Sequence, residues 1–343
     1  MPGEDVQPMG DTMWDAVERI VNTYESFLIT CHVNPDGDAI GSEIALKAFL
    51  EDRDKSVVVV NPSPTPPSLA FLDPEHEIRV FPDDADAHVL DDVDAIFCLD
   101  VNTWDQLGNF ARPLQQSALP RVCIDHHESP DDDFADVIAS DTTSASTGIL
   151  IYELIRRMDG DVSRTIADAV YTTIISDTGT FRFSNTDARV FDVAAAVCRL
   201  GADPYQLHRV VFGSKTWGAG NLLGPVLATV QAAAEGRLAW IHATREMAEA
   251  AGASYDDMDG FVDLVRAIKG VELVLFFKET VDGHIKVSLR SNGKVDAHAI
   301  AEHFGGGGHK MASGLRLDGP LGEAIDKVVN LCLQMPGIRS RLY

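Results

Sequence analysis

Short apolar runs alternate with longer amphipathic stretches along the first two hundred residues. The apolar runs occupy 26–33, 55–62, 94–101 and 121–127. Runs of this length between polar segments are typical of buried strands. Apolar residues recur at helical spacing in stretches at 11–24, 41–53, 143–158, 163–179 and 188–201. Strands that alternate with helices predict an α/β domain with a mostly parallel sheet flanked by helices.

The pattern changes from about residue 213. A Gly-rich segment, GSKTWGAGN, precedes a helical pattern over 222–235. Strand patterns follow at 237–244, 271–280 and 284–291, and helical patterns at 259–270 and 296–304. They predict a smaller α/β domain with a mixed or antiparallel sheet. We expect a first domain over 1–212, a linker over 213–232 and a second domain over 233–343, with the active-site cleft between the two domains.

Acidic residues and histidines follow the predicted strands of the first domain. The segments HVNPDGD, LDVN and DHH each come after an apolar run, and SDTG ends a helical pattern. Their candidate residues are His32, Asp36, Asp38, Asp100, Asp125, His126, His127 and Asp177. The carboxyl ends of parallel strands share one edge of a sheet, where ligands usually bind. Singly, each segment is as well explained by a turn or a helix cap.

Together these residues predict a metal site. Several carboxylates at one edge repel each other unless protons or cations neutralise them. A mixture of imidazole and carboxylate ligands suits Mn²⁺, Fe²⁺ or Zn²⁺ better than Ca²⁺. Pro35 and Gly37 are expected to form a sharp turn that directs Asp36 and Asp38 to neighbouring metal positions, with Asp100 shared between them.

Composition limits the binding partners and the cellular compartment that we expect for the chain. The 343 residues carry a net charge of −25, so the chain lacks the basic surface that grips long nucleic acid. The five cysteines form no CxxC motif, which favours a reducing compartment. The N-terminus is acidic, and no apolar stretch reaches the length of a membrane span. We expect a cytoplasmic protein with no membrane or long-duplex partner.

The motifs HVNPDGDAIGS, LDVN, DHH and SDTG, in this order, resemble those of the DHH phosphoesterase superfamily. HFGGGGHKMASG resembles the glycine-rich motif of the domain associated with it. These motifs extend from residue 32 to residue 314, so the resemblance covers most of the chain. Length and layout are similar to the nanoRNase/pAp phosphatase branch, also called bifunctional oligoribonucleases.

The resemblance implies a role for each residue of the first domain. His32, Asp36 and Asp177 would bind one Mn²⁺, Asp38 and His126 would bind a second, and Asp100 would bridge the two. Other divalent metals stay open. His127 would contact the scissile phosphate or protonate the leaving group, and Asp125 would orient an imidazole. The chain departs from several relatives at Gly148, where they carry glutamate.

In the second domain, the resemblance implies that five residues grip the far phosphate or terminal nucleotide of the substrate. They are Arg290, Gly306, Gly307, Gly308 and His309. Glycine lets the backbone approach an anion closely. The alternatives are a surface strand residue for Arg290 and a flexible loop for the glycine run.

The implied function is metal-dependent hydrolysis of short oligoribonucleotides or of bisphosphate nucleotides such as pAp. Three alternatives stay open: a cyclic- or linear-dinucleotide phosphodiesterase, a RecJ-like single-strand exonuclease, and a non-catalytic nucleotide-binding regulator. A family II pyrophosphatase is disfavoured because its second domain lacks the GGGGH segment. Whether the chain forms a homodimer also stays open.

Overall fold

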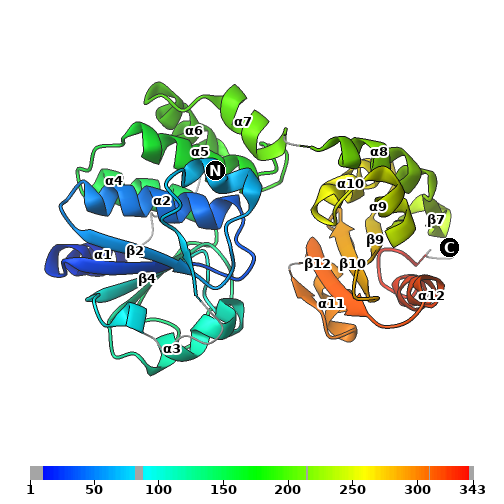
Figure 1. Cartoon of the computed structure of the whole chain (residues 1–343), viewed down its shortest axis with the longest axis horizontal. Helices are drawn as coiled ribbons and strands as arrows, with labels where there is room; N and C mark the ends of the chain where they lie inside the picture. The colour runs from blue at the N-terminus through cyan, green and yellow to red at the C-terminus, as the bar shows by residue number, and fades with distance from the viewer. Residues whose placement is uncertain (1–10, 82–87, 214, 309, 340–343) are drawn as a thin grey trace, which may run out of the picture. The chain divides into compact units, whose positions relative to one another are not determined.

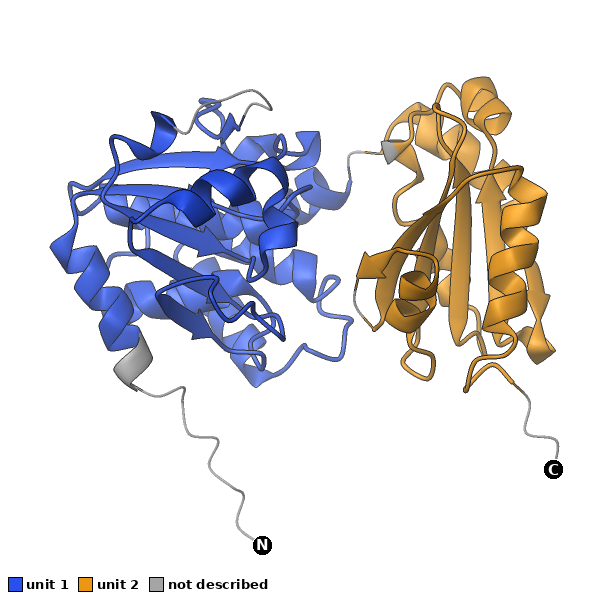
Figure 2. Ribbon diagram, turned by 90° about the horizontal axis from the view of Figure 1, so that it is seen from below, with its two compact units in different colours: residues 1–214 blue, residues 215–343 orange. Residues whose placement is uncertain are grey.

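The computed structural model describes residues 11–81, 88–213, 215–308 and 310–339. The chain forms two compact units, unit 1 over residues 1–214 and unit 2 over residues 215–343 (Figure 2). Each unit has its own sheet, with a hydrophobic core on each face of that sheet. Among the described residues, no helix combines the length and apolar character needed to cross a bilayer.

Unit 1 is built on six parallel strands (Figure 1). Their bounds are β1 Ser26–Thr30, β2 Ser56–Asn61, β3 Arg79–Val80, β4 Ala95–Leu99, β5 Arg121–Asp125 and β6 Val137–Ser140. The order across the sheet is β3-β2-β1-β4-β5-β6, and all pairs are parallel. The chain therefore reverses its direction of progress between β1 and β4, and this switch point is where open parallel sheets bind ligands.

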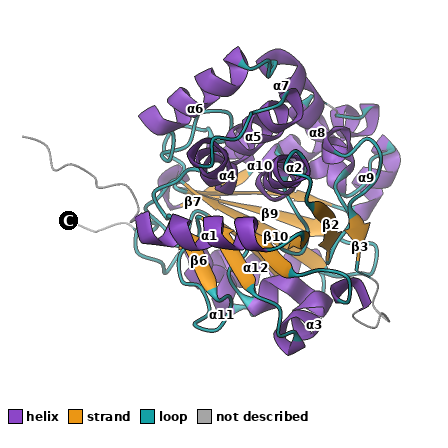
Figure 3. Cartoon of the chain, turned by 90° about the vertical axis from the view of Figure 1, so that its left-hand side faces the viewer, coloured by secondary structure: helices purple, strands orange, loops and turns teal. Residues whose placement is uncertain are grey.

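Helices cover both faces of this sheet (Figure 3). They are α1 Asp11–Thr23, α2 Gly37–Glu51, α3 Ala111–Gln116, α4 Thr147–Arg157, α5 Arg164–Asp177, α6 Ala188–Arg199 and α7 Pro204–Phe212. Phe27 and Ile29 of β1 pack in the core that contains α1, α2, α4 and α5. Leu28 faces the other way, toward the cluster of Leu107, Phe110 and Leu114 at α3. Alternate side chains of a strand thus fill two cores.

Helix α2 begins at Gly37, four residues before the predicted start. The reason is Asp36, whose Oδ1 accepts hydrogen bonds from the backbone N–H groups of Asp38 at 2.9 Å and Ala39 at 3.2 Å. This is an N-cap, which satisfies donors that the first helical turn leaves unpaired. Asp38 consequently lies in the first turn of the helix, and the expectation that Gly37 forms a sharp turn with Pro35 is wrong, because Gly37 is the first residue of the helix.

Unit 2 has a mixed sheet in the order β11-β12-β10-β9-β8-β7. Its strands are β7 Gln231–Ala233, β8 Leu238–Ala243, β9 Leu273–Glu279, β10 Ile285–Ser291, β11 Gly307–Gly308 and β12 Ala312–Leu317. Among these described strands, the β8–β9 pair alone is parallel. The prediction of two α/β domains, the first with a parallel sheet and the second with a mixed or antiparallel one, is confirmed.

The helices of unit 2 are α8 Trp217–Ala228, α9 Arg245–Ala251, α10 Phe261–Arg266, α11 Ala297–His303 and α12 Leu321–Cys332. One core packs α11 and α12 on the sheet, and the other packs α8, α9 and α10 on its opposite face. The helix predicted over 222–235 is wrong at both ends. It begins five residues earlier, and residues 231–233 form strand β7 because they pair with β8. Within the range of the predicted linker, α8 therefore packs as part of unit 2.

Candidate metal centre and active site

The switch point of the first sheet gathers the predicted side chains. His32 follows β1, Asp100 follows β4 directly, and Asp125 is the last residue of β5. Because β1, β4 and β5 are neighbours, these residues meet at one edge. Asp36 and Asp38 enter from the N-terminus of α2, and Asp177 enters as the last residue of α5.

Two glycines allow α2 and α5 to bring their aspartates together. A Cβ on Gly37 would lie 1.9 Å from Ser176 Oγ, and one on Gly41 would lie 2.7 Å from the backbone oxygen of Ala169. Any larger residue would push the two helices apart. Gly37 is therefore required by this close approach, whereas the sequence suggested a role in a turn.

Asp100 occupies the centre of the cluster. Its Oδ2 lies 3.5 Å from His32 Nε2, and its Oδ1 lies 3.5 Å from His126 Nε2 and 3.6 Å from His127 Nδ1. The side chain is 2% exposed. Asp100 adopts a left-handed backbone conformation with φ of 57°, which aspartate tolerates better than most residues. Its two oxygens thus face different imidazoles, as a bridging carboxylate would.

Three overlapping sets of side chains could each hold a cation. They are Asp100 with His126 and His127, His32 with Asp36 and Asp100, and Asp38 with His126 and Asp177. Within each set, one donor atom from every residue lies within 4.8 Å of the others. All seven residues were singled out from the sequence, and the structure brings them to one place.

The N-terminus of α4 holds Asp38. Thr147 N–H donates to Asp38 Oδ2 at 2.7 Å, and Gly148 N–H donates to Oδ1 at 3.0 Å. Ser42 Oγ adds a contact of 3.3 Å to Oδ1. Thr147 Oγ1 also donates to Asp100 Oδ1 at 3.1 Å. A helix N-terminus carries partial positive charge, so it stabilises a buried carboxylate at this position.

Hydrogen bonds on the far side of each imidazole set its orientation. His126 Nδ1 contacts the backbone oxygen of Ser144 at 3.2 Å, and His127 Nδ1 contacts Asp125 Oδ1 at 2.8 Å. Such contacts select the tautomer and aim the other ring nitrogen. For His126 that atom is Nε2, which faces Asp38, Asp100 and Asp177 at 3.5, 3.5 and 3.2 Å.

Arg189 of α6 tethers the segment that carries Ser144 and Thr147. Its guanidinium makes a two-pronged contact with Glu153 of α4, at 2.7 and 2.6 Å. A third contact of 2.7 Å reaches Asp141, at the start of that segment. The bidentate geometry fixes direction as well as distance. Arg189 therefore supports the ligand-holding segment without lying in the cluster itself.

Burial and neighbouring charges shift the pKa values of the clustered side chains. Burial raises the pKa of Asp38 well above its usual range, and the charge of Asp100 raises it further. Burial also raises the pKa of Asp177, to about 7, although the nearby His126 imidazole opposes the shift. Burial lowers the pKa of His126, but the carboxylates around it outweigh burial and raise the value to about 11. Without a cation, shared protons must therefore compensate the crowded carboxylates.

The side chains fit a divalent metal. His126 Nε2 is fully buried and, among the described residues, has no hydrogen-bond partner, although three carboxylates face it. A buried polar atom without a partner is costly. A cation shared by His126 and these carboxylates would satisfy the nitrogen and reduce the repulsion between the acids. Imidazole together with carboxylate is a common donor set for transition metals.

Comparison with known proteins relates the chain to one family. Residues 26–174 match the N-terminal domain of the DHH family, and residues 242–335 match the DHHA1 domain. The bifunctional oligoribonuclease and PAP phosphatase NrnA of Thermus thermophilus is 33% identical over 311 residues. That match covers 88% of this chain and 87% of that protein. The chain belongs to the DHH family.

Two further DHH relatives extend the likeness over both units. The protein of the same name from Bacillus subtilis is 27% identical over 302 residues, covering 86% of this chain and 90% of that one. The crystal structure of an exopolyphosphatase-related protein from Bacteroides fragilis is 30% identical, with a TM-score of 0.90. It covers 96% of this chain and 97% of that one. The resemblance to the DHH superfamily found in the motifs is confirmed.

The arrangement of this DHH site differs from expectation at Asp177. The resemblance paired Asp177 with His32 and Asp36, whereas the structure groups it with Asp38 and His126. The reason is that Asp177 ends α5 on the side where His126 Nε2 lies 3.2 Å away. Gly148, the departure from several relatives, is closely packed: a Cβ there would lie 2.1 Å from Thr173 Oγ1.

In the DHHA1 unit, neighbouring strands bring the predicted substrate-binding residues together. Arg290 of β10 pairs with Ala312 of β12, and Ser313 of β12 pairs with Gly308 of β11. Arg290 is half-buried, burial lowers its pKa, and no carboxylate within the described ranges forms an ion pair with it. His309 lies outside the described residues.

The glycine run is not a free loop. Gly307 and Gly308 form strand β11. A Cβ on Gly306 would lie 2.3 Å from Gly314 O, and one on Gly308 would lie 2.7 Å from Ala312 O. Close packing on β12 therefore accounts for glycine at 306 and 308. Among the predicted residues Gly306, Gly307 and Gly308, a Cβ would meet open space at Gly307, which is therefore the one best placed to contact a ligand; Gly305 is equally open but was not predicted to bind the substrate.

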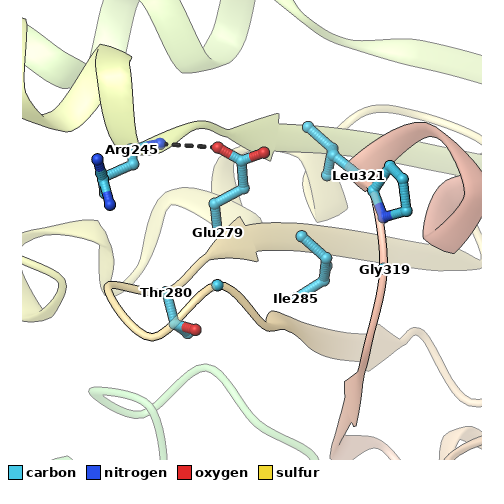
Figure 4. Close-up of a pocket in the computed structure, with 8 residues that line it drawn as sticks. Arg245, Glu279, Thr280, Ile285, Gly319 and Leu321 are labelled. Atoms are coloured by element: carbon cyan, nitrogen blue, oxygen red, sulfur yellow. Dashed lines mark hydrogen bonds between the residues drawn. The ribbon is translucent and has the colours of Figure 1, made fainter.

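A pocket of about 320 Å³ in unit 2 lies apart from these residues (Figure 4). Arg245 N–H donates to Glu279 Oε2 at 3.0 Å along its wall. Its other lining residues are Thr280, Gly283, Ile285, Gly319, Pro320 and Leu321. None of the predicted site residues lines it. The candidate active site is therefore the cluster of side chains in unit 1.

The sequence offered uneven signals for the supporting residues. Ser146 caps α4, which begins at Thr147 inside the predicted helical stretch 143–158, and a serine in that place is the usual signature of a helix N-terminus. That signature could have indicated the N–H groups that hold Asp38. Glu43 gave no such signal. It is fully buried in α2, and Asn61 Nδ2 donates to its Oε2 at 2.9 Å behind the strand that leads to His32.

Proposed function

We propose that the chain hydrolyses short oligoribonucleotides to mononucleotides and removes the 3′-phosphate of pAp-type nucleotides, using a pair of Mn²⁺ ions. The chain is a hydrolase of phosphoester bonds. The observation that carries the proposal is the set of three overlapping Asp–His groups at the switch point, in which Asp100 belongs to two groups. The names of the relatives in Thermus thermophilus and Bacillus subtilis support this substrate class.

We assign His32, Asp36 and Asp100 to one ion, and Asp38, Asp100, His126 and Asp177 to the other. With two adjacent divalent ions bound by these side chains, the site would have an activated water and stabilised charge on the phosphoryl oxygens. The protein holds the side chains of the site rigidly. The N-terminus of α4 orients Asp38, Ser144 orients His126, and Asp125 orients His127. Preorganised ligands need little rearrangement when the reaction proceeds.

His127 would act on the phosphate itself. Burial lowers its pKa, but the hydrogen bond to Asp125 and the charge of Asp100 outweigh burial and raise the pKa overall. These neighbours therefore favour protonation of the ring more than water does. Because Nδ1 is directed at Asp125, we assign to Nε2 the contact with the scissile phosphate and the proton given to the leaving ribose oxygen.

Arg290 and Gly307 would bind the far phosphate or terminal nucleotide. A half-buried guanidinium with no ion-pair partner among the described residues is suited to an incoming anion. One phosphate-binding site is compatible with a net charge of −25, because a short substrate needs few contacts with its sugar–phosphate backbone. We place this activity in the cytoplasm.

The test compares four substrates in the presence of Mn²⁺: an RNA dinucleotide, a long single strand, pAp and pyrophosphate. The protein with Asp100→Ala serves as the control. Cleavage of the dinucleotide and pAp, lost in the control, is expected. Cleavage of the long strand alone would favour a RecJ-like exonuclease. No cleavage with any divalent metal would favour a nucleotide-binding regulator.

A further inference from the structure

A buried amide joins the segment after β4 to the loop that carries His127. Asn102, the residue with this amide, is 3% exposed and lies two residues after Asp100. The left-handed backbone of Asp100, with φ of 57°, turns the chain at the end of β4. Because β4 and β5 are neighbours in the sheet, the segment after β4 meets the loop that follows β5.

Both the side chain and the backbone of Asn102 bind this loop. Its Nδ2 donates to the backbone oxygens of His127 at 3.3 Å and of Glu128 at 3.4 Å. Carbonyl oxygens only accept, so they fix which end of the amide faces the loop. The backbone oxygen of Asn102 accepts from the N–H of Asp131 at 3.0 Å. Asn102 therefore holds the loop on both sides of Ser129, where the chain turns with a φ of 61°.

The segment that carries Asn102 is itself fixed to the other side of the cluster. The backbone oxygen of Gln106, four residues after Asn102, accepts from the N–H of Val33 at 2.7 Å. Val33 follows His32, whose Nδ1 contacts the backbone oxygen of Val33 at 2.9 Å. This short segment thus connects the loops on either side of Asp100.

The ring of His127 needs support at two points. The contact between its Nδ1 and Asp125 Oδ1 sets the rotation of the ring. The position of the ring depends in addition on the backbone that carries it, and Asn102 binds that backbone at the carbonyl of His127 itself. A reacting group displaced by about 1 Å can lose much of its rate advantage, so such support matters for catalysis.

We propose that Asn102 is a positioning residue, which holds the His127 ring where it meets the leaving ribose oxygen. This inference rests on the proposed function, which assigns that contact to His127. As the attacking water forms its bond to phosphorus, the bond to the leaving oxygen breaks, and that oxygen takes the proton from His127 Nε2. Asn102 belongs to none of the three ligand sets, so its loss should affect this proton transfer and leave metal binding intact.

The first test compares two leaving groups in steady-state hydrolysis with Mn²⁺. An RNA dinucleotide releases a ribose oxygen, which needs a proton, whereas the p-nitrophenyl ester of 5′-AMP releases a stable anion that leaves without one. For Asn102→Ala we expect kcat on the dinucleotide to fall about tenfold, as for loss of an orienting partner. The kcat on the nitrophenyl ester should be retained. A residue needed only for folding would lower both rates equally.

The second test needs neither metal nor turnover. Amide hydrogen exchange of the metal-free protein, followed by mass spectrometry, reports how firmly the loop is held. In Asn102→Ala, peptides that cover His127 and Asp131 should exchange faster, while those of β5 should exchange as in the unaltered protein. The manganese content of the purified protein, measured separately, should be unchanged.

Two further variants sharpen both tests. Asn102→Leu has a side chain of similar shape without a hydrogen-bond donor, and it should behave as Asn102→Ala does. Asn109→Ala is the matched control, because Asn109 lies in the same segment and its Nδ2 donates to the backbone oxygen of Phe81 at 3.5 Å. It should leave both rates and the exchange of the loop unchanged.

The proposal is overturned if Asn102→Ala keeps its kcat on the dinucleotide, loses both rates equally, loses its metal, or leaves the exchange of the loop unchanged. The proposed function fails separately, if the unaltered protein cleaves neither the dinucleotide nor pAp. In that case, faster exchange around His127 in Asn102→Ala would still support the positioning of His127 by Asn102.

Discussion

The strands of unit 1 end at one edge and deliver charged side chains from separate segments, whereas unit 2 carries its candidate residues on adjacent strands. Asp38 and Asp100 are buried and hydrogen-bonded on several sides. Arg290 is half-buried, and Gly307 is exposed. Buried carboxylates held in one geometry are suited to catalysis. A partly exposed guanidinium, such as that of Arg290, is suited to reversible binding of an anionic substrate. We expect changes in unit 1 to affect turnover and changes in unit 2 to affect substrate affinity.

The largest effect is expected for Asp100→Asn in unit 1. Removing the shared carboxylate weakens both candidate cation positions, each worth several kcal/mol to the transition state. We expect kcat/KM for a dinucleotide to fall by at least about 10³-fold. Steady-state kinetics and the metal content of the purified protein measure the effect. Asp132→Asn, an exposed aspartate, is the control, and normal activity in Asp100→Asn would refute the proposed site.

The next effect concerns stability. Burial raises the pKa of Glu43 from 4.5 to about 7, although Asn61 opposes the shift. The folded protein therefore favours the protonated carboxyl of Glu43. Its contribution to the free energy of unfolding is fully present below pH 4.5 and is lost as the pH rises to about 7. The loss is about 3 kcal/mol.

Glu43→Gln stays neutral and should lose this pH dependence. Urea unfolding of both metal-free proteins, from below pH 4.5 to above pH 7, measures the difference. If the free energy of unfolding depends on pH in the same way in both proteins, the prediction that burial raises the pKa of Glu43 is wrong.

A smaller effect on activity is expected for Asp125→Asn. Asp125 accepts hydrogen bonds from the backbone N–H of His127 at 3.1 Å and from its Nδ1 at 2.8 Å. Loss of such an orienting partner typically costs 10–100-fold, and we expect about that fall in kcat. Bound metal should stay unchanged, because Asp125 belongs to none of the three ligand sets. Loss of the metal together with activity would instead make Asp125 a ligand.

The smallest effect is expected in unit 2, from Arg290→Ala. Losing one charged hydrogen-bonding partner should raise KM for a dinucleotide about tenfold, with kcat retained. Arg316→Ala is the matched control on the same sheet, because Arg316 is 57% exposed and already paired with Asp282. A fall in kcat with unchanged KM would mean that unit 2 takes part in the chemistry, and the contrast between the units would fail.

Much of this architecture could be read along the chain. The apolar runs at 26–33, 94–101 and 121–127 contain strands β1, β4 and β5, because buried parallel strands need continuous apolar sequence. Errors arose where a local pattern had competing outcomes. Gln231–Ala233 suits a helix by composition, yet it forms a strand because β8 offers an open edge.

Sequence alone singled out the side chains that gather at the switch point of the first sheet, because a metal site needs particular donor atoms and the motifs supply them. Tertiary structure decided how these donors are shared. It placed Asp177 beside His126 and directed the N–H groups at the start of α4 to Asp38. It also made Gly37 the contact point of two helices. These features depend on distances between segments far apart in sequence, and only packing of α2, α4 and α5 on the sheet sets those distances.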